Sequence, residues 1–168
     1  MRGTPCWRAR LVRAHQLVLA LASHDRLTGL PNRRLFEDRL SQAALAAYRD
    51  HRAGALLLVD LDGFKAVNDS QGHAAGDLVL KSVAERIRDT LRQTDIYCRY
   101  GGEEFAFVFP DTALPEAGLL ANRLRESIAA DAIPVGDGQT VPISLSLGLI
   151  EVNELALDLA LNQADQAM

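Results

Sequence analysis

A Gly-Gly-Glu-Glu run at residues 101–104 separates two short segments of β-favouring apolar residues. Glycines in succession permit positive φ angles and a tight reversal of the chain. The pattern therefore predicts two antiparallel strands, over residues 96–100 and 104–109, joined by a hairpin that carries Glu103 and Glu104 at its tip. Adjacent carboxylates repel each other unless a cation lies nearby. An ordinary solvated hairpin tip would explain the run equally well if it stood alone.

A second acidic segment lies upstream, where the apolar run 55–59 ends at Asp60 and is followed by Asp62, Gly63 and Lys65. An uninterrupted apolar run is typical of a central strand that is covered on both faces. Carboxylates at the end of such a strand, together with those of a neighbouring hairpin, are the hard oxygen donors that Mg²⁺ prefers. Since Mg²⁺ usually keeps substrate phosphates among its ligands, a phosphate-bearing substrate is implied, and Lys65 can neutralise a terminal phosphate.

These two segments and three others resemble the GGDEF family of diguanylate cyclase domains. Residues 101–105 read Gly-Gly-Glu-Glu-Phe, and residues 60–69 read Asp-Leu-Asp-Gly-Phe-Lys-Ala-Val-Asn-Asp. The family's first motif, its substrate-loop motif and its late strand are matched by residues 25–33, 72–77 and 144–148. The resemblance runs from about residue 25 to the last residue, in the family's order and spacing.

The alternation of apolar patterns indicates an α+β fold, with a mainly antiparallel central sheet flanked by helices. The resemblance implies, more narrowly, the ferredoxin-like palm shared with other nucleotidyl cyclases. We expect helices over residues 31–47, 74–92, 115–130 and 155–168, strands over 53–60, 96–100, 104–109 and 141–151, and a turn at 136–138. Leu119, Leu124 and Ile128 should lie on the core face of the third helix. Cys98 lies in an expected strand and should be a buried, reduced thiol.

Residues 25–168 are expected to form one GGDEF domain, preceded by a helical connector at residues 1–24. Leu11, His15 and Val18 have the spacing of a short coiled-coil seam, and in relatives such a helix usually links the domain to an upstream sensor. Relatives also generally continue into a tyrosine, a lysine and an arginine that contact the triphosphate. Because this chain ends before those residues, we expect a C-terminally truncated domain with weaker GTP binding or slower turnover.

Charge and hydropathy limit the partners and the location. The chain has 18 basic and 22 acidic residues, and four of the arginines lie in the first 22 residues, so the remainder is markedly acidic. An acidic domain is a poor binder of nucleic acid. The apolar run 17–22 is too short to span a bilayer, and no convincing signal-peptide pattern is present. We therefore expect a cytoplasmic domain that reaches a membrane only through an upstream domain absent from this sequence.

The resemblance implies that two GTP molecules are joined into cyclic di-GMP with release of two pyrophosphates. Since one domain holds only one GTP, the reaction requires a homodimer in which two domains face each other. The cofactor would be Mg²⁺, with Mn²⁺ as the alternative ion. Its ligands by similarity are Asp60, the backbone carbonyl of Leu61, Glu103 and Glu104. Glu103 is also the candidate base that takes the proton from the attacking 3′-hydroxyl.

By the same resemblance, other residues contact the substrate. Asn68 and Asp77 would recognise guanine, since a carboxylate can accept from the N1 and N2 donors that adenine lacks. Considered alone, Asn68 would also suit a turn or a cap, and Asp77 would suit a first-turn acid favoured by the helix dipole. Asp62 would either contact the metal through water or hold the loop. The β- and γ-phosphates would be contacted by Lys65 and by the backbone around Gly63 and Phe64. Gly101 and Gly102 would leave room for the nucleotide beside the hairpin.

A second site resembles the family's RxxD inhibitory site for the product. Arg92 and Asp95 stand shortly before the hairpin, and Arg123 on a later helix would supply its second arm. Arginine presents a planar fork that pairs with guanine or phosphate. The alternative is a helix-end Arg–Asp pair on the surface, worth at most about 1 kcal/mol.

Three functions of different classes remain open from the sequence. The first is the diguanylate cyclase. The second is a regulatory module that binds GTP or cyclic di-GMP without making product, but degenerate members of the family usually lose the hairpin acids that this chain keeps. The third is another palm-type nucleotidyl transferase, such as an adenylyl cyclase, which the guanine-matching pair disfavours.

Overall fold

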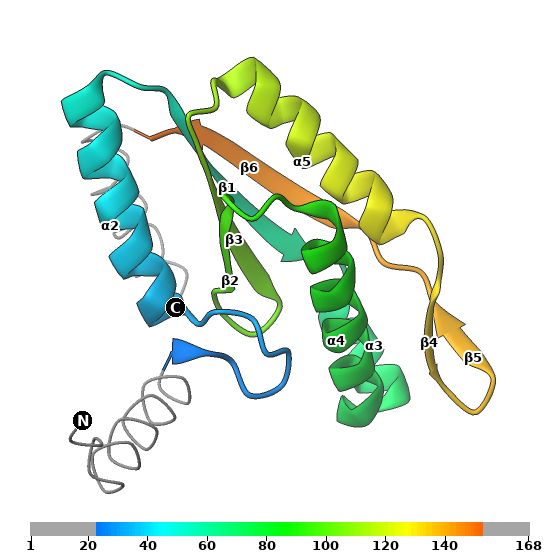
Figure 1. Cartoon of the computed structure of the whole chain (residues 1–168). Coiled ribbons are helices and arrows are strands. Elements are labelled where there is room, and N and C mark those ends of the chain that lie inside the picture. The colour runs from blue at the N-terminus through cyan, green and yellow to red at the C-terminus, as the bar shows by residue number, and fades with distance from the viewer. Residues whose placement is uncertain (1–22, 153–168) are drawn as a thin grey trace, which may run out of the picture.

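The computed structural model describes residues 23–152 and is centred on a four-stranded sheet with the strand order β2-β3-β1-β6 (Figure 1). All neighbouring strands of this sheet are antiparallel. Its members are β1 (Gly54–Leu61), β2 (Ile96–Arg99), β3 (Glu104–Pro110) and β6 (Leu145–Glu151). A separate hairpin consists of β4 (Ile133–Gly136) and β5 (Gln139–Val141), around the turn expected at residues 136–138.

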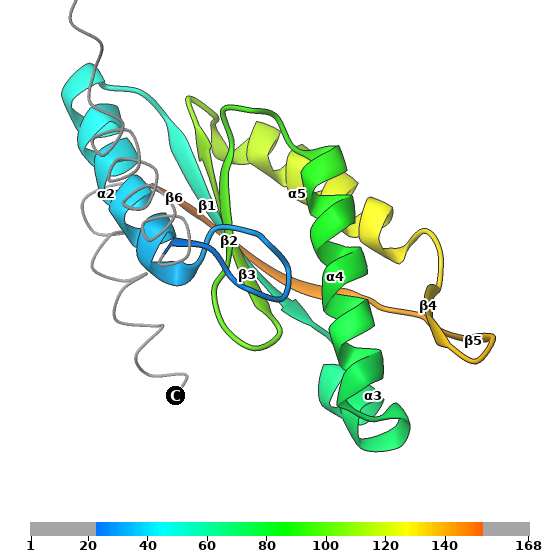
Figure 2. The same cartoon turned by 60° about the horizontal axis from the view of Figure 1, so that its bottom comes forward.

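Helices cover both faces of the sheet (Figures 1 and 2). α2 (Arg33–Asp50) lies on one face, and α4 (His73–Thr90) and α5 (Leu114–Ala129) lie on the other. A short helix, α3 (Phe64–Gln71), follows β1 directly and lies beside α4. The predicted α+β fold, an antiparallel sheet flanked by helices, is therefore confirmed.

The central strand β1 contributes to two apolar cores because successive side chains of a strand point to opposite faces. Leu57 and Val59 are 0% and 3% exposed and belong to the core under α4 and α5. Leu56 belongs to the core on the other face, with Phe36 and Leu40 of α2. Since full burial of one large apolar side chain contributes about 1.5–3 kcal/mol, β1 is stabilised from both faces.

The expected elements within the described residues are confirmed in type, with ends shifted by a few residues, apart from the last strand. Residues 141–151 were expected to form one strand, but β5 ends at Val141 and β6 begins at Leu145. Pro142 lies in the gap and has no N–H to donate to a strand ladder. Across residues 23–152, every helix is too short or too polar to cross a membrane. The expected connector and final helix lie outside the described residues.

Side-chain burial agrees with most of the expected core. Leu124 and Ile128 of α5 are fully buried, and the thiol of Cys98 is buried in β2. Leu119 was expected in the same core but is 69% exposed, so that prediction is wrong. Ala121 and Leu124 are buried on the face of α5 that packs on the core. Leu119 lies on the opposite, outer face of the helix.

Helix α3 was not expected from the sequence. Its eight residues bury only Phe64 and Val67, which is too few apolar positions to define a helical period. Asn68 lies inside this helix, so the alternative of an isolated turn or cap at Asn68 is wrong. Gly72, with a φ of 82°, ends α3 and precedes α4.

The contact between α3 and α4 depends on a glycine. Gly76 is buried in α4, and a Cβ built on it would lie 2.1 Å from Asn68 Oδ1 and 3.1 Å from Phe64 Cζ. A Cβ at this position would require the Asn68 side chain and the Phe64 ring to shift, so the two helices approach each other through Gly76. The contact also brings Asn68 next to the residue that precedes Asp77.

Replacing Gly76 by alanine is expected to destabilise the domain by about 1–3 kcal/mol, because the added methyl group must displace Asn68 and Phe64. Gly118 of α5 is the matched control, since a Cβ there meets nothing within 4 Å. Gly118→Ala should stabilise the domain by up to about 1 kcal/mol through helix propensity. Urea unfolding measures both changes, and equal stability of the two variants would contradict the packing role of Gly76.

Candidate active site

The register of β1 and β3 brings the proposed metal ligands to one corner of the sheet. Asp60 lies directly opposite Glu104, and the Leu61 N–H donates to the Glu103 carbonyl at 3.3 Å. Directly opposed residues of an antiparallel pair point to the same face. The backbones of the four residues assigned to the ion therefore lie close to one another where β1 ends and the β2–β3 hairpin turns.

Burial and mutual repulsion disfavour the ionised form of two of these carboxyl groups. Partial burial, and then the charge of Asp62, raise the pKa of Asp60. Partial burial, and then the charges of Asp60 and Glu104, raise the pKa of Glu103. A divalent cation bound between them would relieve the repulsion and stabilise the ionised carboxylates.

The donor set fits a hard ion such as Mg²⁺ or Mn²⁺, since it consists of oxygens alone. Among the residues from 23 to 152, no three side chains of the His, Cys, Asp or Glu type are grouped closely enough to hold a metal by themselves. The Leu61 carbonyl, waters and substrate phosphates would have to complete the coordination. Mg²⁺ commonly keeps ligands of this kind.

The two hairpin glycines make room for different groups. A Cβ at Gly101 would lie 2.5 Å from Glu104 Oε2, so the Glu104 carboxylate fills the space beside it. At Gly102, a Cβ would meet nothing within 4 Å. The Tyr100 and Gly101 N–H groups donate to the Glu104 carbonyl at 2.8 and 3.3 Å and close the turn. Room for a nucleotide was expected at both glycines, and it is Gly102 that is open.

Arg99, the last residue of β2, connects the hairpin to the N-terminal turn at residues 25–31. Its Nε and Nη2 donate to the Gly102 carbonyl at 3.1 and 2.7 Å. Its Nη1 donates to both carboxylate oxygens of Asp25, at 3.1 and 3.2 Å. This role of Arg99 was not expected from the sequence. The sequence did contain a signal for this contact. Arg99 stands directly before Tyr100 at the start of the hairpin, and Asp25 is the first residue of the first family motif.

Asp25 accepts further hydrogen bonds from its own turn. The N–H and the hydroxyl of Thr28 donate to Asp25 Oδ1 at 2.8 and 2.7 Å. Burial acts to raise the pKa of Asp25, but the hydrogen bonds from Thr28 and Arg99 and the charge of Arg99 outweigh it, so the pKa lies below its usual value. The Arg99 N–H also donates to the Pro31 carbonyl at 3.0 Å. The hairpin is therefore joined to this turn by both main-chain and side-chain bonds.

The residues assigned to the phosphates lie at the start of α3. Gly63 precedes the helix with a φ of 70°, a conformation that favours glycine. Phe64 is buried in the core, whereas Lys65 is exposed. The ammonium group of Lys65 is therefore accessible to a phosphate at this end of the helix.

Asp62 accepts two short hydrogen bonds from the segment that begins β6. The hydroxyls of Ser144 and Ser146 donate to Asp62 Oδ2 and Oδ1, at 2.6 Å each. These bonds lower the pKa of Asp62. Because both carboxylate oxygens are engaged, the geometry favours a loop-holding role for Asp62 over a metal contact through water.

The two residues assigned to guanine are brought together by the α3–α4 contact. Asn68 Oδ1 lies against Gly76, and Asp77 follows as an exposed residue of α4. α4 begins at His73 and has no acid in its first turn. The alternative reading of Asp77 as a first-turn acid is therefore not supported.

The residues assigned to product inhibition lie after α4 and on α5. Asp95 is 8% exposed, and its carboxylate accepts the backbone N–H of Arg92 at 2.9 Å. The alternative interpretation expected instead an ion pair between the two side chains on the surface. The Arg92 guanidinium lies 3.8 Å from Glu116 Oε1 on α5. Arg123 follows Glu116 by seven residues, so it lies on the same face of α5.

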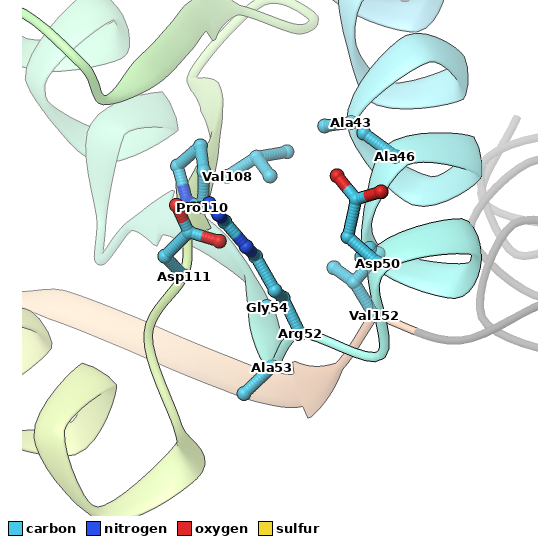
Figure 3. Close-up of a pocket in the computed structure, with 11 residues that line it drawn as sticks. Ala43, Ala46, Asp50, Arg52, Ala53, Gly54, Val108, Pro110, Asp111 and Val152 are labelled. Carbon is cyan, nitrogen blue, oxygen red and sulfur yellow. Dashed lines mark hydrogen bonds and ion pairs between the residues drawn. The ribbon is translucent and has the colours of Figure 1, made fainter.

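A pocket of about 120 Å³ lies at the opposite end of the sheet (Figure 3). Ala43 and Ala46 of α2 line it on one side, and Gly54 and Pro110 line it from the strands. Gly54 begins β1 and Asp60 lies near its end, so roughly 20 Å of strand separates the pocket from the hairpin carboxylates. The pocket is therefore no part of the candidate active site.

The family model described as diguanylate cyclase, GGDEF domain, matches residues 22–168. The protein is thus of the nucleotidyl-cyclase class that the family resemblance implied. More narrowly, this chain belongs to the GGDEF family of diguanylate cyclase domains.

Individual relatives agree with this assignment. The bifunctional diguanylate cyclase/cyclic di-GMP phosphodiesterase MucR of Pseudomonas aeruginosa is 50% identical over 119 residues, which are 71% of this chain and 17% of MucR. The diguanylate cyclase TpbB of the same species is 42% identical over 167 residues, which are 96% of this chain and 38% of TpbB. This chain therefore spans well under half of either relative.

A solved structure confirms the fold. The coiled coil and GGDEF domain of DgcB from Caulobacter crescentus, in complex with c-di-GMP, matches with a TM-score of 0.83 at 29% identity. The match covers 95% of this chain and 85% of that one.

Asp25→Asn is expected to reduce the free energy of unfolding by about 1–2 kcal/mol at neutral pH, because it weakens the bonds to Thr28 and Arg99. The folded pKa of Asp25 lies below the ordinary value of 3.8, so its contribution is complete above that value and is lost as the pH falls through the folded pKa. The difference from the unmutated protein should therefore shrink as the pH falls below 3.8 and through the lowered folded pKa. Urea unfolding at several pH values measures it, with Asp38→Asn at an exposed α2 position as the control. A difference that does not change with pH would contradict this role.

Proposed function

We propose that this domain is a Mg²⁺-dependent diguanylate cyclase, which joins two GTP molecules into cyclic di-GMP and releases two pyrophosphates. The observation that carries the proposal is the register of β1 and β3, which puts Asp60 opposite Glu104 and Leu61 next to Glu103. Family membership and the names of the relatives support it. Because GTP is a cytoplasmic nucleotide, we expect the activity in the cytoplasm.

Each new bond forms when the 3′-hydroxyl of one GTP attacks the α-phosphorus of the other. A bound Mg²⁺ would stabilise charge on the phosphoryl oxygens and acidify the attacking hydroxyl. Asp60, the Leu61 carbonyl and the hairpin glutamates would hold it. Glu103 takes the proton from the 3′-hydroxyl as the general base.

The substrate contacts follow the path of α3. Gly63 and Phe64 offer backbone N–H groups at the start of the helix, and Lys65 adds a positive charge for the β- and γ-phosphates. Asn68 and Asp77 lie further along, at the contact of α3 with α4, and recognise guanine. This arrangement separates the phosphate end of the nucleotide from the base end along one short helix.

The product requires two nucleotides, whereas each domain binds one. We therefore propose that two copies of the domain face each other as an antiparallel homodimer during the reaction. The rate per domain should then rise with protein concentration over the range in which the dimer forms.

Chromatography of the purified chain after incubation with GTP and Mg²⁺ tests the activity. Cyclic di-GMP is expected, and Glu103→Ala should reduce its rate of formation at least about 100-fold because the base is lost. Glu85→Ala, at an exposed position of α4, is the matched control, and removal of Mg²⁺ with a chelator should stop the reaction. Binding of GTP without product at high protein concentration would favour a regulatory module instead, and a preference for ATP would contradict the guanine assignment.

Arg92, Asp95 and Arg123 are proposed to bind the product and inhibit the enzyme. Arg92→Ala is expected to raise the inhibition constant of added cyclic di-GMP by about tenfold, because a bidentate contact to guanine is lost. Initial rates at increasing product concentration measure the constant. Arg125→Ala, which removes another exposed arginine of α5, is the control, and an unchanged inhibition constant in Arg92→Ala would remove the claim.

A further inference from the structure

Asp62 is held by a hydrogen-bonded clamp, which we define as Asp62, Ser144 and Ser146. The two serine hydroxyls donate to different oxygens of the Asp62 carboxylate, at 2.6 Å each. The Asp62 N–H donates in turn to the Ser144 carbonyl at 3.0 Å. Asp62 is therefore joined to this segment through its backbone and through both oxygens of its side chain.

The clamp lies at the point where β1 becomes the phosphate-binding loop. The pairing of β1 with β6 runs as far as Leu61 opposite Leu145, and it sets Ser146 directly beside Asp60. Asp62 is the first residue beyond this pairing, and Gly63, which follows it, has no side chain and open space around its Cα. The clamp thus provides side-chain hydrogen bonds that hold the loop between β1 and α3 to the start of β6.

We propose that Ser144 and Ser146 are positioning residues for the nucleotide, which act by holding the phosphate-binding loop through Asp62. This inference rests on the proposed function, since it concerns how the same site binds GTP. The clamp fixes the backbone of residues 61–64, and with it the Leu61 carbonyl and the N–H groups at the start of α3. It also turns the Asp62 carboxylate toward β6, which leaves Asp60 as the strand carboxylate that faces the hairpin glutamate.

The competing explanation is that the charge of Asp62 acts on the metal ion, directly or through water. The two explanations differ in what matters at position 62. A positioning role needs the hydrogen bonds, which an amide can make with the two hydroxyls, one as acceptor and one as donor. A metal role needs the negative charge, which an amide lacks.

Binding of 3′-deoxy-GTP in the presence of Mg²⁺, measured by titration calorimetry, separates these explanations because this nucleotide lacks the attacking hydroxyl. The double variant Ser144→Ala/Ser146→Ala should weaken binding by about tenfold, since two bonds to a charged group are lost. Asp62→Asn should weaken binding less than the double variant does. Substitution of both serines by threonine keeps the hydroxyls and should restore affinity. Ser41→Ala, which removes a hydroxyl from α2, is the control.

Hydrogen exchange provides a readout that does not depend on nucleotide or turnover. The amides of Asp62, which donates to the Ser144 carbonyl, and of Val67, which donates to the Gly63 carbonyl, should exchange faster in the double serine variant than in the unmutated chain or the threonine variant. The melting temperature shows that each variant is folded. Normal exchange and normal nucleotide affinity in the double serine variant would overturn the proposal. A larger loss of affinity in Asp62→Asn than in the serine variant would overturn it in favour of the metal role. If the unmutated chain bound no guanine nucleotide, the proposed function would fail, whereas loop exchange that rose only in the serine variant would still support the clamp.

Discussion

Backbone pairing of β1 with its two neighbours sets the positions of the functional groups. Asp60 has Glu104 opposite it on one side and Ser146 on the other. A slip of one residue would turn Asp60 to the wrong face of the sheet. The register is enforced by burial, because Leu56 must reach the core of α2 while Leu57 reaches the core of α4 and α5. The geometry of the acidic corner is therefore a consequence of apolar packing along the whole strand.

The carboxylates at this corner fall into two groups. Asp25 and Asp62 are held by hydrogen-bond donors from distant segments, and the pKa of each is lowered. Asp60 and Glu103 have no such donors among residues 23–152, and burial and repulsion raise the pKa of each. The held carboxylates are suited to fixing the turn and the loop around the site. The other two are the ones that a cation would stabilise, which agrees with the proposed division between positioning groups and metal ligands.

Much of the fold could be predicted because its signals are local. The glycines of the hairpin, the apolar run before Asp60 and the helical periods around Leu124 each specify an element within a short window. Helix α3 could not be predicted in this way, since Phe64 and Val67 alone do not define a period. Leu119 was expected in the core with its neighbours, but the rotation of α5 against the sheet leaves it exposed.

The sequence by itself determined the family, the acidic hairpin and the list of residues that carry the proposed chemistry, because these are properties of short segments and their order. Only the tertiary structure showed which groups hold the Asp62 carboxylate, which hairpin glycine is open, and that Arg99 joins the hairpin to Asp25, 74 residues away. The physical reason is that a hydrogen bond or a close contact depends on distances of tenths of an ångström between groups from different elements. Those distances arise when strands adopt their register and helices pack, as the contact of Gly76 with Asn68 illustrates.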